Sequence, residues 1–386
     1  MGIFVVMKKA DEKYAGVFFL RLQRLEISSF RNIDHQCLEP GPGINIFGGS
    51  NGQGKTNILE AIFFACVGKS FRALRDNEMI QWEREYALIN GLFTTTGRDF
   101  ELVLMQAAGS KKIRVNGSAA KGYPMGWPGV VLFTPEDLEI IKGSPQRRRD
   151  FFDQEIGPVN NQYRYYLSNY QRVVQQRNNL LRDIREGSGN KDSLAAWDEQ
   201  LIGYGVKIIK DRMILLNRVS NEVRKIYREL TRGTEEISLR YGSTLEIDSN
   251  LQEEEIATRF REALLQAKRE EIARGQTVIG PHRDDLIFFI NGKEIRLYGS
   301  QGQHRSLVLA LKLTMAQIWY NEIGEFPILL LDDVMSELDA HRQGALLKRI
   351  LNNGQSFITS SVFTDIETGT AVAKKNFIVQ NGAIIN

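Results

Sequence analysis

The chain has 386 residues, of which 42% are apolar and 25% are charged, and its formal net charge is +3. These values are typical of a soluble globular protein that is long enough for two domains. The two cysteines, Cys37 and Cys66, exclude a disulfide framework, and no apolar run reaches the roughly 18 residues of a membrane span, so we expect a cytoplasmic protein with buried cysteines and no membrane partner.

The N-terminal part of the chain alternates short strands with one helix. Strands are predicted over residues 19–35 (two strands and a turn), 44–47, 86–117 (a meander with an Asn-Gly turn) and 130–133. Apolar residues at helical spacing predict a helix over residues 55–67, and Gly68 follows as its C-cap. Residues 1–18 precede this unit and are interpreted as an N-terminal extension.

The middle of the chain is helical and basic. Helical spacing extends from about residue 146 to 230, with breaks near Gly157 and at residues 187–189. Residues 140–233 carry 18 Lys and Arg against 11 Asp and Glu. This excess favours a polyanionic partner such as DNA, but a solvated helical surface would have a similar composition.

Strands return after this region and frame one more long helix. Strands are predicted at residues 237–241, 277–298 and 328–331, and helices at 253–274 and 300–319. The fold class that follows is α/β, with an ABC-type ATPase head, a mixed sheet around a phosphate loop, that is split in sequence by a mainly helical second lobe. We place the two halves of the head at residues 19–150 and 272–386, and the inserted lobe at 151–271.

A complete phosphate-binding loop follows the strand at 44–47. Its residues are Gly49, Ser50, Asn51, Gly52, Gln53, Gly54, Lys55 and Thr56, and with Asn57 we assign them to nucleotide binding. Glycines let backbone N–H groups turn toward a phosphate, and the helix N-terminus adds partial positive charge. Lys55 would reach the β- and γ-phosphates of ATP, and the Thr56 hydroxyl would ligate Mg²⁺.

Two adjacent carboxylates end the buried strand at 328–331. Asp332 is the expected Mg²⁺ ligand, and Asp333 is the candidate base that orients the attacking water. ABC-type ATPases often carry the longer Glu at the second position, and a shift of about 1 Å can lower a rate on the order of 10²-fold. We therefore predict slow hydrolysis.

A polar helix start precedes the apolar helix at 300–319. Ser300 and Gln303 have the spacing of a capping box, with Gly302 between them. Together with the two motifs above, this segment resembles the signature loop of ABC ATPases. That resemblance implies that Ser300, Gly302 and Gln303 contact the γ-phosphate of ATP bound to a second subunit, so that ATP holds a head-to-tail dimer together. We count Ser300, Lys55 and Asp333 as catalytic candidates.

Several further motifs resemble the RecF family of DNA replication and repair proteins, and the match extends from about Leu20 to the C-terminus. They lie at residues 25–32, 51–62, 68–72, 133–138, 142–149, 280–286, 300–305 and 331–339. The resemblance implies a weak, DNA-stimulated ATPase that dimerises with ATP on single-stranded, duplex or gapped DNA. It also implies that the protein helps load the recombinase through mediators of the RecR and RecO type, and that residues 336–339 communicate across the dimer.

Some assignments stay open in the sequence. Arg72, Arg147, Arg148 and Arg149 are candidates for DNA contact, although the last three could instead pair with Asp150 and Asp153. Tyrosines at 163, 165, 166 and 170 could stack on bases, but their helical spacing favours packing. The loop at 358–361 contains no histidine that could sense the γ-phosphate, and we look for the glutamine loop of ABC ATPases at 133–137.

Two other functions are compatible with an ABC-type head. One is a transporter-driving ATPase subunit, which would need a surface for a membrane partner. The other is a chromosome-organising ATPase of the SMC type, which separates its motif halves by long heptad repeats. Here the insertion is about 120 residues without sustained heptads, which disfavours the second function.

Overall fold

The head contains two six-stranded sheets. The computed structural model describes residues 20–95, 98–120, 128–157, 160–247, 251–351, 353–361 and 374–385, so the predicted N-terminal extension lies outside it. The first sheet is antiparallel, in the order β2-β1-β4-β5-β6-β7. Its strands are β1 (Arg21–Phe30), β2 (Ile33–Leu38), β4 (Tyr86–Thr95), β5 (Arg98–Ala107), β6 (Ser110–Val115) and β7 (Ser118–Ala119).

The second sheet is mostly parallel and has the order β15-β14-β3-β13-β12-β8. Its strands are β3 (Ile44–Gly48), β8 (Val130–Phe133), β12 (Ile328–Leu331), β13 (Ser356–Ser360), β14 (Lys374–Gln380) and β15 (Ala383–Ile385). Only β15 is antiparallel to its neighbour. Strands far apart in sequence are thus adjacent, which is the split head that the sequence predicts.

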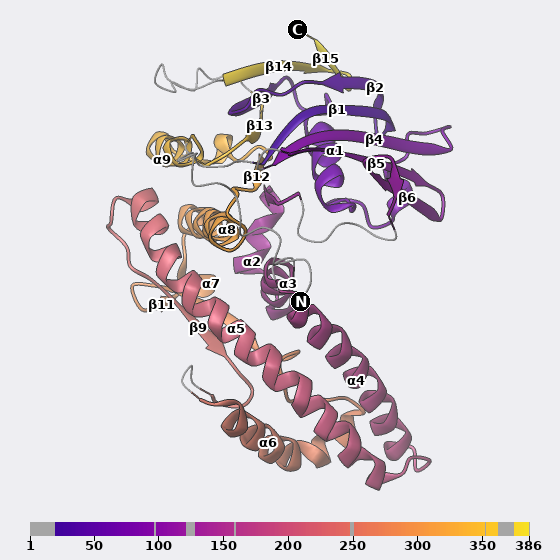
Figure 1. The fold of residues 1–386 in the computed structure, drawn as a ribbon. Helices are drawn as coiled ribbons and strands as arrows, with labels where there is room; N and C mark the ends of the chain where they lie inside the picture. Colours follow the sequence, from indigo (N-terminus) through magenta and orange to yellow (C-terminus); the bar gives the residue numbers. More distant parts are fainter. Residues whose placement is uncertain are drawn as a thin grey trace.

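Alternate residues of the parallel strands belong to two different cores. In β12, Ile328 and Leu330 pack with α1 (Lys55–Val67) and the antiparallel sheet, whereas Leu329 and Leu331 pack on the other face. Helices α8 (Gln301–Ile323) and α9 (Ala340–Ile350) lie on that other face (Figure 1). Because both faces are covered, β12 is a continuous apolar run, as expected for a buried parallel strand.

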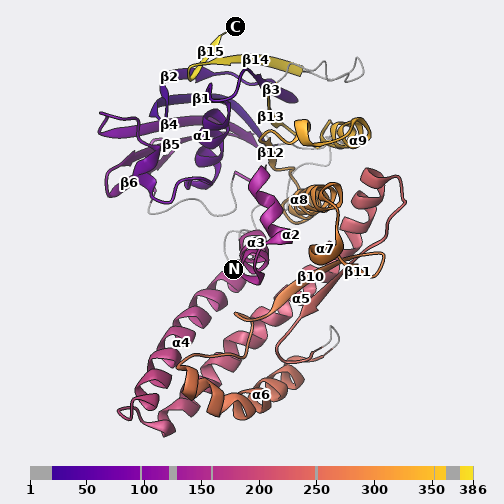
Figure 2. The ribbon, with the colours of Figure 1, turned by 180° about the vertical axis from the view of Figure 1, so that it is seen from behind.

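The second lobe extends away from the head as a helical arm (Figures 1 and 2). Its helices are α3 (Pro145–Ile156), α4 (Asn161–Arg185), α5 (Leu194–Thr231) and α6 (Glu253–Arg274). A small sheet, in the order β11-β10-β9, joins β9 (Ile237–Gly242), β10 (Asp285–Ile290) and β11 (Lys293–Glu294). Short helices complete the chain: α2 (Glu139–Lys142), α7 (Ile295–Tyr298) and 3₁₀ turns at Asp76–Met79, Pro135–Leu138, Lys191–Ser193 and Met335–Glu337.

A strand pairing crosses the predicted end of the inserted lobe. β9 lies inside the predicted insertion and pairs along six residues with β10, which lies beyond the predicted boundary at residue 271. That boundary stays a prediction. The predicted strand region at 277–298 also contains the helix α7 at its end.

Buried ion pairs hold the arm together at its base. The Arg212 guanidinium on α5 is buried, donates three hydrogen bonds to the Asp153 carboxylate of α3 and also donates to the Tyr163 hydroxyl and the carbonyl of Pro281. Asp284, also buried, accepts hydrogen bonds from the Tyr241 hydroxyl and the Thr244 backbone. Removing either partner of such a pair would leave an uncompensated charge, so these residues fix how α3, α5 and β10 meet.

The expectations for the cysteines and for the tyrosines of α4 have mixed outcomes. Cys66 is buried in α1, but Cys37 is exposed on β2, so only one of the two cysteines is a core residue. Within the described ranges no helix has the length and apolar character needed to cross a membrane. Of the four tyrosines on α4, Tyr163 and Tyr170 are buried, whereas Tyr165 is 59% exposed.

Gly280 gives a test of the packing at the arm base. Its φ is +122°, and a Cβ there would collide with the Tyr170 hydroxyl and lie 2.8 Å from the Phe260 ring. Gly292 also has a positive φ, +76°, but a Cβ there would meet nothing within 4 Å. We expect Gly280→Ala to lower the free energy of unfolding by about 2–4 kcal/mol and Gly292→Ala by about 1 kcal/mol. Urea unfolding measures both, and equal losses would refute the crowding argument.

Candidate nucleotide site

The carboxyl ends of three neighbouring parallel strands meet at one edge of the second sheet. β3 leads into the phosphate loop, β12 ends at Leu331 immediately before Asp332 and Asp333, and β13 lies between them. In open α/β sheets this edge is where ligands bind. The fold therefore brings the loop of residues 49–56 and the two carboxylates together from opposite ends of the sequence.

The conformation of the phosphate loop depends on glycine. Gly49 has a φ of +149°, and a Cβ there would collide with the carbonyl oxygen of Val379 on β14. Gly54 has a φ of +104° and lies against the Asn32 side chain. The loop is also held from outside, because the Gln53 side chain accepts a hydrogen bond of 2.8 Å from the backbone of Asn381. Gln53, predicted to bind nucleotide, thus uses its side-chain oxygen to anchor the loop.

The Lys55 ammonium group lies inside the loop. It donates hydrogen bonds of 2.6 and 2.9 Å to the carbonyl oxygens of Gly49 and Ser50. Burial lowers its pKa, and the charges of Asp333 and Asp332 oppose that shift. A buried ammonium group with only two neutral acceptors is well suited to exchange them for phosphate oxygens, which compensate its charge better.

Asp332 and Thr56 form the candidate metal site. The Thr56 hydroxyl donates a hydrogen bond of 2.9 Å to Asp332 Oδ1, and the Thr359 hydroxyl of β13 donates another of 2.8 Å to the same oxygen. Burial raises the pKa of Asp332, and these two hydrogen bonds oppose the rise. A carboxylate and a hydroxyl are the hard oxygen donors that Mg²⁺ prefers.

These residues fit Mg²⁺ only together with a phosphate ligand. Within the described part of the chain, no group of three His, Cys, Asp or Glu side chains could hold a metal ion by itself. Mg²⁺ is commonly bound by one or two carboxylates plus substrate phosphates, rather than by a cage of protein ligands. Thr56 and Asp332 match that incomplete donor set.

Asp333 has an unusual backbone conformation. Its φ is +52°, which is uncommon for a residue other than glycine, and its N–H donates a 2.8 Å hydrogen bond to the Thr359 hydroxyl. The Ser336 hydroxyl lies 3.0 Å from Asp333 Oδ1 and donates to it. Thr359 therefore contacts both carboxylate residues, and Asp333 is held in a fixed orientation at the sheet edge.

The start of α8 has the predicted capping box. Gln303 N–H donates to the Ser300 hydroxyl at 3.2 Å, and Ser300 N–H donates to Gln303 Oε1 at 2.8 Å. The Gln303 amide also donates a 2.8 Å hydrogen bond to Glu235, whose other oxygen accepts from the Tyr227 hydroxyl of α5. In the described part of the chain no hydrogen bond joins Ser300 or Gln303 to the phosphate loop of the same chain.

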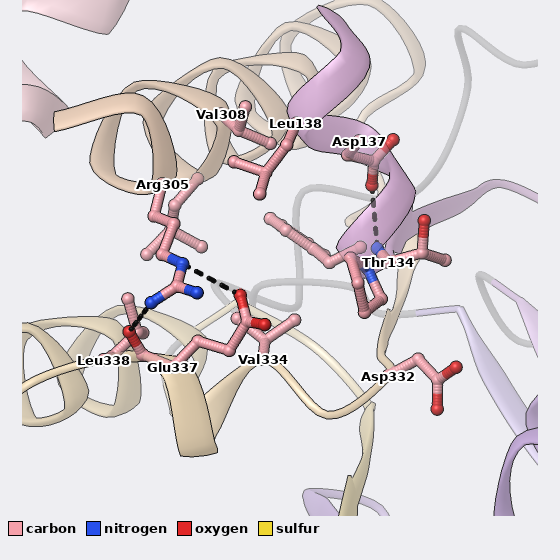
Figure 3. A pocket seen from close by; sticks show the side chains of 12 residues that line it. Thr134, Asp137, Leu138, Arg305, Val308, Asp332, Val334, Glu337 and Leu338 are labelled. Carbon is pink, nitrogen blue, oxygen red and sulfur yellow. Dashed lines mark hydrogen bonds and ion pairs between the residues drawn. The ribbon is translucent and has the colours of Figure 1, made fainter. Parts of the chain in front are cut away.

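Residues 336–339 connect the carboxylates with α8. Ser336 contacts Asp333, and the Glu337 carboxylate pairs with Arg305 of α8 at 3.0 Å (Figure 3). This pair lines a cavity of about 40 Å³ that also reaches Asp332 and Thr134. Asp339 then caps α9 by accepting a hydrogen bond of 2.9 Å from the Arg342 N–H.

The segment at 133–137 enters the same edge but contains no glutamine. β8 ends at Phe133, which is in register with Leu331 of β12. Beyond it, Asp137 accepts a hydrogen bond from the Thr134 backbone (Figure 3), and it pairs with Lys312 of α8 at 2.9 Å. The polar groups that this segment offers near the site are therefore those of Thr134 and Asp137.

The arginine triplet of α3 does not form one exposed cluster. Arg148 is buried and pairs with both carboxylate oxygens of Asp285, at 2.7 and 2.8 Å, and buried Arg149 donates to the Asp284 carbonyl. DNA contact by these two side chains stays a prediction that their burial disfavours, and the ion pair of Arg148 is with Asp285 instead of Asp150 or Asp153. Arg147 alone is exposed.

Arg72 lies on the nucleotide side of the head. Its guanidinium donates a 3.1 Å hydrogen bond to Asn57, the residue after the phosphate loop, and its charge lowers the pKa of Asp332. Asn57 also donates to Asn32 at 2.7 Å. This position suits a contact with nucleotide phosphate at least as well as one with DNA.

Three participants were missed in the sequence. Thr359 was given no role, Glu235 lies in a loop 68 residues before Gln303, and Arg305, the partner of Glu337 in the predicted communication segment, is 32 residues away from it. The segment 358–361 was expected to follow a strand, but Thr359 lies within β13. Hydroxyl residues at the end of a parallel strand beside a carboxylate are candidates for such a contact.

Known proteins are similar to this chain along most of its length. A family model described as an AAA domain matches residues 24–277. The DNA replication and repair protein RecF of Pelotomaculum thermopropionicum is 47% identical over 364 residues, which are 94% of this chain and 99% of the relative. A solved structure of the recombination mediator protein RecF with ATP, in the RecFOR pathway, is 34% identical with a TM-score of 0.86, over 96% and 99% of the two chains.

A more distant structure shows the fold alone. The Smc head domain of Pyrococcus furiosus, bound to the C-terminal domain of ScpA, is 16% identical and has a TM-score of 0.56 over 95% of each chain. Together these structures confirm the predicted fold class, an ABC-type head with a second lobe.

Asp332→Asn tests whether Asp332 is a metal ligand, because the substitution should stabilise the folded chain but remove its response to Mg²⁺. Burial raises the pKa of Asp332 in the folded chain, so ionisation above that pKa opposes folding, and below the pKa of an unfolded Asp the effect vanishes. At pH 7 we expect Asp332→Asn to raise the Tm by roughly 1–3 °C and to abolish the Mg²⁺-dependent part of the ATP-induced Tm shift.

Asp211→Asn is the matched control, because burial also raises the pKa of Asp211, which lies on α5. It should leave the Mg²⁺-dependent shift intact. Differential scanning fluorimetry with ATP, with and without Mg²⁺, measures both variants. A full Mg²⁺-dependent shift in Asp332→Asn would contradict the assignment.

Proposed function

The chain belongs to the RecF family of DNA replication and repair proteins, and we propose from this premise that it is an ATPase whose ATP-bound form dimerises on DNA. The observation that carries the proposal is the single sheet edge where Lys55 lies inside the glycine loop and Asp332 holds Thr56 at 2.9 Å. These groups cover the phosphates and the metal of a nucleotide, but they leave the γ-phosphate side to another donor.

A second copy of the chain is the source of that donor. Ser300 and Gln303 form a capped helix start with no hydrogen bond to the phosphate loop of their own chain. Ser300 is exposed, and two apolar side chains just before it, Leu297 and Tyr298, are 60% and 72% exposed. Exposed apolar residues beside a polar, anion-accepting helix start are what a symmetric interface around ATP would bury.

Within this dimer each residue has a defined role in hydrolysis. Lys55 neutralises charge on the β- and γ-phosphates, and Thr56 and Asp332 hold the metal position. Mg²⁺, when bound, supplies charge neutralisation of the phosphate oxygens. Asp333 orients the water that attacks the γ-phosphate, while Ser300 of the second copy donates to the phosphate from the other side.

Slow hydrolysis follows from the way Asp333 is held. Its carboxylate accepts a hydrogen bond from Ser336, and its strained backbone is fixed by Thr359. The side chain is one methylene shorter than that of Glu, and one of its two oxygens already accepts from Ser336, which limits how the carboxylate can approach a water. ATP therefore acts as a switch for assembly, and DNA binding at the dimer stimulates a low basal rate.

The biological setting is proposed from the relatives. Their names describe DNA replication and repair, and the solved relative is described as a recombination mediator in the RecFOR pathway. We propose that this protein likewise binds single-strand, duplex or gapped DNA, acts with mediators of the RecR and RecO type and helps load the recombinase. A chromosome-organising role is disfavoured, because the α4–α5 hairpin turns back near residue 190 instead of continuing as a long coiled coil.

Two variants separate nucleotide binding from dimerisation. Lys55→Met should abolish ATP binding, since the buried position would lose the charge that pairs with phosphate. Ser300→Arg should retain ATP binding by the monomer and block the ATP-dependent dimer. Equilibrium binding of a fluorescent ATP analogue and analytical ultracentrifugation with ATP and Mg²⁺ measure the two steps.

Ser300→Ala is the control for the helix cap, because it loses the cap, at a cost of about 1 kcal/mol, without adding bulk at the interface. It should dimerise less strongly than the unchanged chain but better than Ser300→Arg. Full ATP-dependent dimerisation of Ser300→Arg would overturn the proposed assembly.

Glu235 provides a third test, as a positioning residue for Gln303. Glu235→Ala removes the acceptor of both Gln303 and Tyr227, so we expect dimerisation to weaken on the order of tenfold while ATP binding by the monomer stays unchanged. Glu235→Gln keeps one oxygen for Gln303, and it should restore dimerisation. Equal behaviour of the two variants would contradict a positioning role.

A further inference from the structure

Six exposed side chains form a straight row along the outer face of α4. They are Tyr165, Ser168, Arg172, Gln175, Asn179 and Arg182, with alternating spacings of three and four residues. The opposite face, which includes Tyr170, Val173 and Arg177, is buried against α5 and α6. At 1.5 Å per residue, the row from Tyr165 to Arg182 is about 26 Å long.

The row lacks negative charge over this whole length. α4 contains five arginines, and its single carboxylate residue is Asp183, which follows Arg182. α6 of the same lobe is different, because its sequence mixes six glutamates with five Lys and Arg, and Arg274 pairs with Glu270. The surface of α6 is solvated by side chains of both charges. A need for solvation therefore does not explain why the outer face of α4 has no Asp or Glu.

The positive charge on this face is not compensated within the described part of the chain. Arg177 on the buried side pairs with Asp198 and Glu271, at 2.7 and 2.6 Å. Arg172 on the outer face has no ion pair among the described residues, and the hydrogen bonds of Arg182 go to amide and carbonyl oxygens of α4 itself. Arg177 is thus neutralised inside the lobe, whereas the charges of Arg172 and Arg182 face solvent, and Arg185 at the end of the helix pairs with Glu186.

The chemistry of the row selects its partner. Arg, Asn, Gln, Ser and Tyr side chains are those that hydrogen-bond to phosphate and sugar oxygens of nucleic acids. A protein interface would need an apolar centre. Among the described residues of α4, Tyr165 is the one large apolar residue that is exposed. Single-stranded DNA would need a series of stacking aromatic residues, which the row also lacks.

We propose that the outer face of α4 is a docking surface for the phosphate backbone of duplex DNA. A row of about 26 Å matches roughly seven to eight base pairs, at about 3.4 Å per base pair. This inference rests on the proposed DNA-binding function and locates it on α4, in place of the buried arginines of α3. α4 extends from α3, at the junction with the head, to the far end of the arm, so bound duplex follows the arm (Figures 1 and 2).

The salt dependence of duplex binding tests the surface. Each phosphate contact that is lost lowers the slope of log K against log salt by about 0.9. We expect Arg172→Ala to lower the slope by about one, and Arg172→Ala with Arg182→Ala to lower it by about two. Fluorescence anisotropy of a labelled 30-base-pair duplex, with ATP and Mg²⁺ at several salt concentrations, measures the slope for the full chain.

Arg269→Ala is the matched control, because Arg269 is an exposed arginine of α6 in the same lobe. It removes the same charge from the chain and should leave the slope unchanged. Equal slopes for Arg172→Ala, Arg269→Ala and the unchanged chain would overturn the surface. Loss of affinity for single-stranded DNA alone would overturn the assignment to duplex.

Measurements on the unchanged chain distinguish a failure of the proposed α4 surface from a failure of the proposed DNA-binding function. If the unchanged chain binds no DNA at any salt concentration, the proposed function fails. If it binds duplex with a steep salt slope that Arg172→Ala and the double variant preserve, DNA binding stands and the α4 surface fails. Circular dichroism and the ATP-induced Tm shift verify that each variant remains folded and binds nucleotide.

Discussion

A buried carboxylate at the end of a fully buried strand is the constraint on which the nucleotide site depends. Asp332 follows four apolar residues of β12, is largely buried itself, and has a raised pKa because burial disfavours its charge. Such a group costs stability unless a cation or hydrogen-bond donors compensate it. Thr56 and Thr359 supply the donors, and each comes from a different strand or helix at the same sheet edge.

That requirement explains why the head is divided in sequence without being divided in space. β3 with the phosphate loop lies before the inserted lobe, whereas β12 and β13 lie after it, yet β13 pairs with both. The inserted lobe enters between β8 and α8, which contact each other directly. The pair of Lys312 with Asp137 joins the two halves of the head, and the hydrogen bond of Gln303 to Glu235 connects the start of α8 with the lobe.

Sequence patterns predicted the local features well, because their causes are local. Four such features depend on neighbouring residues and are present in the structure. They are the glycine loop, the Gly68 cap, the Ser300–Gln303 capping box and the continuous apolar run of β12. The failures involve partners distant in sequence. Arg148 pairs with a residue 137 positions away, and β9 pairs with β10 across a helix, so neither the arginine triplet nor the lobe boundary could be assigned from spacing.

Burial, more than composition, decides what the basic middle of the chain can bind. A buried arginine that pairs with a carboxylate, as Arg148, Arg177 and Arg212 do, contributes to net charge but is unavailable to phosphate. The long-range field of the lobe depends only on the total charge, whereas the contacts that hold DNA require exposed guanidinium groups. On α4, helical periodicity separates buried from exposed arginines. The charge of an arginine that faces α5 must be neutralised by a carboxylate, whereas the charge of an arginine on the opposite side of the helix can face solvent. A count of Lys and Arg therefore gives only the net charge of the lobe, and the exposure of each guanidinium group decides whether it is available to a phosphate.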